Sequence, residues 1–171
     1  MADLTEVKID GTTVIDSSGS VNVPSGQTYS INGTPLTYTD VSAAASDHTH
    51  TPVVSIDFII DGGGSAITTG VKGFVEVPFA CTITGWTVMG DQSGSIVVDV
   101  WKDTYANFPP TVADTIAGSE KPTLSSAQKN QDLSLSTWTT SVAAGDILAF
   151  NVDSASTVTR VTVALRATRS V

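Results

Sequence analysis

The sequence predicts an all-β protein, in which an extended N-terminal β-repeat arm or stem precedes an antiparallel, jelly-roll-like β-sandwich. Thr, Ser, Val and Gly dominate the 171 residues, whereas the runs of Leu, Glu, Lys and Ala that favour helical bundles are almost absent. Short apolar runs are separated by turn signals such as Asp61-Gly62-Gly63-Gly64, with no helical periodicity between them. With 40% apolar residues, the chain has enough material for one sizeable core.

The first predicted element, residues 1–39, is an arm built on a seven-residue repeat. In sevens from Val7 it reads VKIDGTT, VIDSSGS, VNVPSGQ and TYSINGT. Each unit is a short β run followed by a turn signal, such as Asp10-Gly11 or Asn32-Gly33, and is too short to bury an apolar face alone. Stacked neighbouring units or identical chains wrapped together would supply the missing core, so we expect a thin oligomeric β stem, with a disordered polar arm as the alternative.

The second predicted element, residues 40–52, is a short helical turn followed by a linker. Thr39 or Asp40 can cap a turn over residues 41–45. Pro52 favours extended geometry before it, and residues two apart in an extended chain share a face. His48 and His50 are therefore expected to point the same way.

The third predicted element, residues 53–171, is the sandwich. Its expected strands are separated by clusters of Gly, Asp and Ser, and the Pro-containing stretch 103–126 is expected to be one long loop. The strands are predicted at 54–61, 71–77, 82–89, 95–101, 133–138, 147–152 and 157–167.

Two parts of the chain resemble tailed-phage virion proteins. Residues 40–51, DVSAAASDHTHT, resemble the fibre linker Asp-Val-Gly-Ala-Ala-Pro-Ala-Ser-His-Thr-His, although Ser42, Ala45 and Asp47 depart from it. The preceding GQTYSING, residues 26–33, is similar to the trimeric β stems of such fibres. Residues 58–67, 97–103 and 144–150 are similar to a domain that recurs at the C-termini of tail-associated and head-associated proteins. The resemblance implies a virion surface protein, made in the host cytoplasm.

The only two histidines, His48 and His50, are candidate metal ligands. On a three-fold axis, one pair per chain would place six imidazoles around a site suited to Fe, Ni or Zn. The resemblance supports this hypothesis, because fibre trimers use a His-X-His pair in this way. Two solvated histidines are the alternative, since a single chain offers too few ligands, and no cofactor is otherwise required.

Aromatic residues supply the candidate contact residues. Trp86 and Trp101 lie in alternating strands, which favours a core position. Trp138 and the loop around Tyr105, Asn107 and Phe108 are better candidates for exposed contacts, including stacking on sugar rings, although such a loop can equally serve subunit packing.

Composition and charge exclude several function classes. The 17 acids and 8 bases give a formal charge of -9, which disfavours binding to nucleic acid or to an anionic membrane. No apolar run approaches the roughly 20 residues of a membrane span, and the first ten residues lack the apolar core of a signal peptide. The lone Cys81 lies in an apolar run and is expected to be a buried small hydrophobe.

These observations favour a homotrimeric capsid decoration or cement protein whose arm engages the shell. Seven acids against one base precede Phe58, which suits docking onto a basic patch of a capsid or tail surface. The alternative is a small tail-fibre or receptor-binding protein that contacts host surface glycans. An enzyme is not expected, because a glycan hydrolase needs a pair of acids that the sequence does not show.

Overall fold

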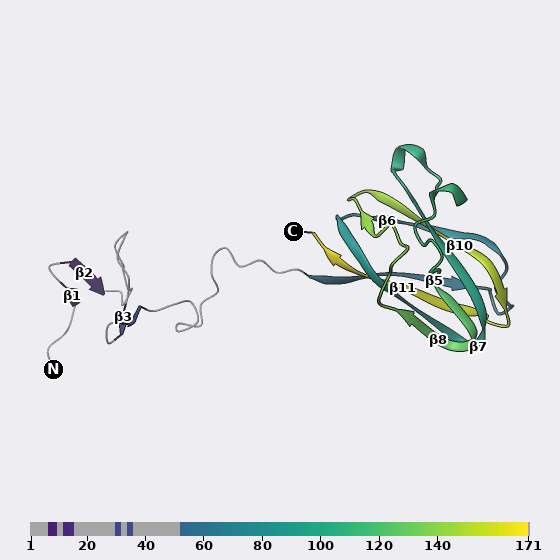
Figure 1. Ribbon diagram of the computed structural model, residues 1–171, viewed down its shortest axis with the longest axis horizontal. Helices are drawn as coiled ribbons and strands as arrows, with labels where there is room; N and C mark the ends of the chain where they lie inside the picture. Colours follow the sequence, from purple (N-terminus) through teal and green to yellow (C-terminus); the bar gives the residue numbers. More distant parts are fainter. Residues whose placement is uncertain (1–6, 10–11, 16–29, 32–33, 36–51, 171) are drawn as a thin grey trace. The chain divides into compact units, whose positions relative to one another are not determined.

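The computed structural model describes residues 7–9, 12–15, 30–31, 34–35 and 52–170 (Figure 1). The chain divides into two compact units, Met1–Thr49 and His50–Val171. In the first unit, β1 (Val7–Ile9) pairs antiparallel with β2 (Thr12–Ile15), and β3 (Ser30–Ile31) pairs antiparallel with β4 (Thr34–Pro35). The rest of the seven-residue repeat, and the predicted linker with its two histidines, lie outside the described residues.

The second unit is one curled antiparallel sheet with the strand order β5-β11-β7-β10-β6, and β8 and β9 also pair with β7. The predicted all-β, sandwich-like fold is confirmed. Two three-residue 3-10 helices, η1 (Tyr105–Asn107) and η2 (Val112–Asp114), are the helical segments of the described residues, and neither can cross a membrane. The strands are β5 (Val53–Asp61), β6 (Gly70–Val77), β7 (Cys81–Asp103), β8 (Thr123–Asp132), β9 (Ser141–Val142), β10 (Asp146–Ser156) and β11 (Arg160–Arg169).

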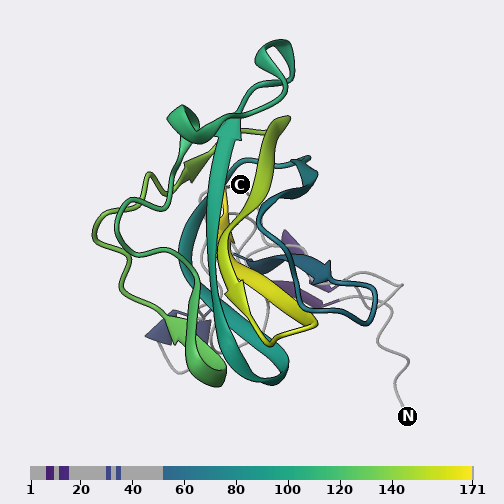
Figure 2. The same ribbon diagram turned by 90° about the vertical axis from the view of Figure 1, so that its right-hand side faces the viewer.

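Strand β7 is the centre of the fold, and it joins the two halves of the sheet. Its first part pairs with β11 up to Gly90, and its last part pairs with β10 from Ser95 onward. The chain bends in between, where Gly94 has no room for a Cβ, which would lie 2.7 Å from the carbonyl oxygen of Ser156. Figure 2 shows the resulting curl. The core lies between the two halves.

The prediction of two strands separated by a turn at residues 90–94 was therefore wrong, because β7 is continuous from Cys81 to Asp103. Glycine, aspartate and serine in that segment read as a turn. In the structure the segment bends the strand instead, and its irregular pairing with β8 absorbs the bend through register shifts on either side of Gly94.

The predicted strand at 133–138 was also wrong, and the strand β8 instead begins within the predicted loop 103–126 and ends at Asp132, just before the predicted strand. Residues 133–138 alternate, but side-chain carboxylates take up their backbone N–H groups. The N–H of Ser134 donates to Asp132 Oδ1 (2.9 Å), and those of Ser136 and Thr137 donate to Glu120 (2.8 Å each). These bonds replace a strand ladder.

The core closes where the two outermost strands of the sheet order approach each other. Phe58 of β5 stacks on Phe150 of β10, with ring centroids 4.4 Å apart. A Cβ on Gly73 of β6 would lie 2.8 Å from the Phe58 ring, so glycine at this position admits the ring. Among the residues whose burial is described, the hydrophobic cluster of the second unit extends from Ile56 to Ala167.

Candidate functional site

The candidate site is a projecting loop, residues 104–114, which we call the aromatic loop. It leaves the end of β7 and stands clear of the sheet in both views (Figures 1 and 2). Tyr105 is 82% exposed at its tip, and Phe108 and Val112 are also exposed. Phe74 of β6 contacts the Phe108 ring edge-on, with centroids 4.8 Å apart and an interplanar angle of 66°. The contact ties the loop to the sheet while leaving both rings half exposed.

Two carboxylates fix the shape of the aromatic loop. Asp103 Oδ1 accepts hydrogen bonds from the backbone N–H of Thr104 (2.7 Å) and from Asn107 Nδ2 (3.1 Å), and these bonds lower the pKa of Asp103. At η2, the N–H of Thr111 donates to Asp114 Oδ2 (2.7 Å), and the N–H of Asp114 donates to the Thr111 carbonyl (2.9 Å). A loop held in this way presents its apolar side chains with little conformational entropy left to lose.

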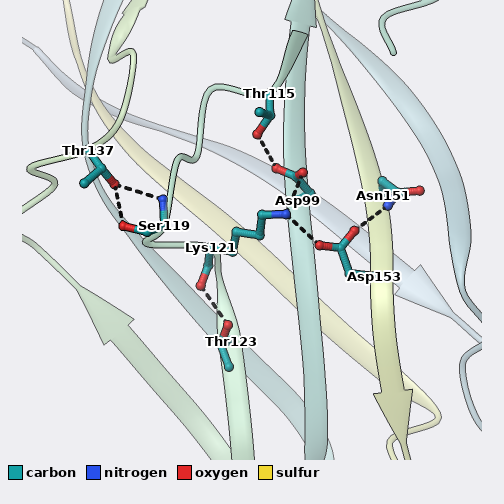
Figure 3. A network of polar contacts seen from close by, with 8 residues as sticks. All are labelled: Asp99, Thr115, Ser119, Lys121, Thr123, Thr137, Asn151 and Asp153. Atoms are coloured by element: carbon teal, nitrogen blue, oxygen red, sulfur yellow. Dashed lines mark hydrogen bonds and ion pairs between the residues drawn. The ribbon is translucent and has the colours of Figure 1, made fainter. Parts of the chain in front are cut away.

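Beyond the loop, residues 115–121 lie against β7 as a strap, held by a buried ion-pair network (Figure 3). Asp99, which is 1% exposed, accepts a hydrogen bond from Thr115 Oγ1 (2.6 Å), and its other oxygen lies 2.9 Å from Lys121 Nζ. Lys121 also contacts Asp153 (2.7 Å), and this hydrogen bond is the main cause of its raised pKa. The Asp99 carboxylate therefore holds the strap against β7.

Glu120 is the second anchor of the strap. Its carboxylate accepts the backbone N–H and hydroxyl groups of Ser136 and Thr137, which lower its pKa to about 2. Its backbone carbonyl accepts both indole N–H groups, from Trp86 (2.9 Å) and Trp138 (3.0 Å). One residue therefore joins β7, the strap and the segment before β9.

The predicted contact residues separate into two groups. Tyr105, Asn107 and Phe108 are exposed together on the aromatic loop. Trp138 was expected beside them but is 8% exposed, because its indole N–H finds the Glu120 carbonyl and its ring joins the hydrophobic cluster. Trp86 and Trp101 are buried, as predicted.

Sequence reasoning missed Phe74 as a member of the site, although a signal was present. In the strand predicted at 71–77, Phe74 shares a face with Lys72 and Glu76. A large aromatic residue between two charged residues on one strand face is placed toward solvent, which is a reason to look for a contact there. Val112, in a loop between prolines and acids, carried no comparable signal.

The predicted metal site at His48 and His50 stays a prediction, because both histidines lie outside the described residues. Within the described part of the chain, no three His, Cys, Asp or Glu side chains are grouped as metal ligands. Cys81 is buried as predicted, and burial, followed by the charge of Asp146, raises the pKa of its thiol.

Comparison with protein-family models and with curated proteins found no match for the chain.

Proposed function

We propose that the chain is a structural protein of a phage virion, namely a homotrimeric capsid decoration or cement protein anchored by its N-terminal arm. The observation that supports this proposal is the division of the chain into two units at Thr49 and His50, the second of which has a hydrophobic core of its own. A sandwich with its own core leaves the arm free to serve as an anchor. The role is non-enzymatic, and the place of action is the virion.

The distribution of charge supports the arm as the anchor. Residues 1–49 carry six acids and one base, whereas the rest of the chain carries eleven acids (17 minus 6) and seven bases (8 minus 1). Such a one-sided charge steers docking onto a basic surface, and salt screens it with a Debye length of about 8 Å at physiological ionic strength. Docking through the arm should therefore weaken as salt rises.

The test is reconstitution on virions that lack the protein. The full chain and a fragment comprising residues 53–171 are added at low and at high salt, and the bound copies are counted. We expect hundreds of copies of the full chain, fewer at high salt, and hardly any of the fragment. Equal binding of the fragment would show that the arm is not the anchor, and a few dozen copies would indicate a fibre instead of decoration.

The aromatic loop favours a second candidate function, that of a small tail-fibre or receptor-binding protein that contacts host surface glycans. Exposed aromatic rings stack on the apolar faces of sugars, and Asn107 adds an amide beside Tyr105 and Phe108. Asp103 and Asp114 flank the rings, so neutral glycans fit better than anionic ones.

This candidate is tested with the full chain on host cells and on neutral polysaccharide extracted from their surface. Tyr105→Ala should reduce binding at least tenfold without changing the unfolding midpoint, because this side chain is almost fully exposed. Val71→Ala, which removes an exposed apolar side chain of β6 outside the loop, is the matched control. Unchanged binding by Tyr105→Ala would reject the aromatic loop as the contact.

A further inference from the structure

The outer face of one half of the sheet is uncovered by any described segment. This half consists of β5, β11, the first part of β7, and β8, and we call its outward side the open face. Its outward side chains include four large apolar residues that are each 47–62% exposed, namely Val53, Ile59, Met89 and Leu133. On the other half, by contrast, Asp99 and Trp101 point outward from β7 and are buried.

Strand pairing places these residues in rows across the open face. Ile59 pairs with Thr162, which pairs with Met89, and Asp57 pairs with Ala164, which pairs with Thr87. Leu133 lies over Gly85, where an added Cβ would come within 2.7 Å of its Cδ2 atom. Threonine, alanine and large apolar side chains therefore form the middle of these rows, which end on Lys129 and Gln131 of β8, and exposed apolar side chains grouped in this way are typical of a contact surface.

Strand β5 forms one margin of the open face, and its outer edge forms no strand pairing with a described segment, although the Phe58 side chain reaches Gly73 of β6 on the core side. Its nine residues, VVSIDFIID, contain no lysine, proline or bulge of the kind that blunts an exposed edge. An edge with this composition is suited to contact with another chain.

The open face carries an acid and a base that form no ion pair with each other. Asp57 of β5 and Arg166 of β11 both point outward, and neither forms an ion pair with another described residue. They are diagonal neighbours, because Asp57 pairs with Ala164 and Arg166 pairs with Ser55. An acid at the edge and a base on the adjacent strand make edge and face complementary to each other.

We propose that the β5 edge of one copy packs on the open face of the next copy around a three-fold axis, with Asp57 of one copy beside Arg166 of its neighbour. The proposal rests on the homotrimer proposed above and adds a contact between sandwiches to the one expected between arms. Four strands about 4.8 Å apart and nine residues of about 3.4 Å each give a footprint of about 600 Å². A standard interface buries about 800 Å² on each partner, so this contact would supply part of the trimer interface and the contact expected between arms would supply the rest.

The first test uses charge reversal in the full chain. Asp57→Arg and Arg166→Asp should each reduce the trimer fraction at micromolar concentration in sedimentation, or lower the melting temperature where the arms still hold the trimer. The double reversal should restore both values. Glu76→Arg, which reverses an exposed acid on β6, is the matched control and should change neither. Single reversals that behave like this control would overturn the proposal.

The second test is disulfide trapping with Asp57→Cys and Arg166→Cys in one chain. Such diagonal neighbours are about 7–8 Å apart, and their Cβ atoms, although somewhat closer, lie beyond the roughly 3.5–4.5 Å of a disulfide, so none is expected within one chain; the native Cys81 is buried. Oxidation should give covalent trimers on a denaturing gel, and neither single variant should give them.

The outcomes of trapping separate this proposal from the homotrimer on which it rests. Covalent dimers without trimers would indicate a two-fold contact and overturn the three-fold arrangement. Absence of cross-links in a protein that sediments at three times 17.6 kDa would overturn the open-face contact while supporting the trimer. A wild-type chain that sediments as a monomer would overturn both.

Discussion

Replacing Lys121 by Met removes the cation that faces the buried carboxylate of Asp99. Asp99 is 1% exposed, and without Lys121 its Oδ2 atom would face no cation, while Thr115 still donates to Oδ1. Breaking a buried ion pair on one side costs about 3–5 kcal/mol. Because 29% of the Lys121 side chain is exposed, water can partly replace it, and we expect a loss of about 2–3 kcal/mol of unfolding free energy.

Two companion variants apportion that loss. Asp153→Asn removes only the outer partner of Lys121, whose side chain is 34% exposed, so the expected loss is at most about 1 kcal/mol. Asp99→Leu combined with Lys121→Met replaces the pair by apolar side chains, and should be more stable than Lys121→Met alone. Urea unfolding followed by tryptophan fluorescence measures all three, because Trp86, Trp101 and Trp138 are buried.

The pH dependence provides an independent check. The pKa of Lys121 is raised above its usual 10.5 in the folded state, so its contribution is complete below that pH and is lost as the pH rises through the folded-state pKa. The wild type should lose stability above about pH 10.5 more steeply than Lys121→Met. A loss below about 0.5 kcal/mol in Lys121→Met, or an equal loss in Asp153→Asn, would refute the dependence of Asp99 on Lys121.

Three further predictions concern other parts of the chain. The ionised Glu120 side chain contributes stability that is complete above its usual pKa of 4.5 and is lost as the pH falls toward its folded-state pKa of about 2. The unfolding free energy of Glu120→Gln should therefore fall less steeply with decreasing pH in this window than that of the wild type, and an equal slope would contradict this role. Gly85→Ala should cost about 1–3 kcal/mol in urea unfolding, because its Cβ would lie 2.7 Å from the Asp132 carbonyl oxygen; a cost below about 0.5 kcal/mol would mean that the strand can shift. Elemental analysis of the trimer should find about one transition-metal ion. His48→Ala and His50→Ala should each lose this ion and melt at a lower temperature than the wild type. A wild-type protein that contains no metal and is as stable as these variants would reject the site.

Strands whose signals are local could be predicted from the sequence. β5 and β6 largely alternate apolar and polar residues and are followed by Gly62 and Pro78, and in β10 an apolar run directly follows the turn residues Gly145 and Asp146, so their positions follow from local pattern and turn chemistry. β8 could not be found in this way. It lies along β7 with most of its residues exposed, and its sequence TLSSAQKNQD carries no apolar alternation that would mark it.

In the candidate site, too, only the residues with a local sequence signal could be predicted. Tyr105, Asn107 and Phe108 follow a strand and precede two prolines, so their exposure follows from a local pattern. The burial of Trp138 depends on a carbonyl at Glu120, 18 residues away in sequence. No pattern around Trp138 encodes that partner, since a loop tryptophan is exposed or buried according to which acceptor the fold brings to its N–H.

The acids of the second unit have identifiable partners within the fold. Most of them accept backbone N–H groups at turns and strand ends, as carboxylates in short connections do. Such bonds join Asp61 to Gly63, Asp91 to Thr159, Asp103 to Thr104, Asp114 to Thr111, Asp132 to Ser134 and Asp146 to Ala143. Because turn geometry accounts for these charges, their number in the sandwich says little about its partners. The six acids of residues 1–49 lie outside the described residues, and the function proposed above assigns them to docking on a basic surface.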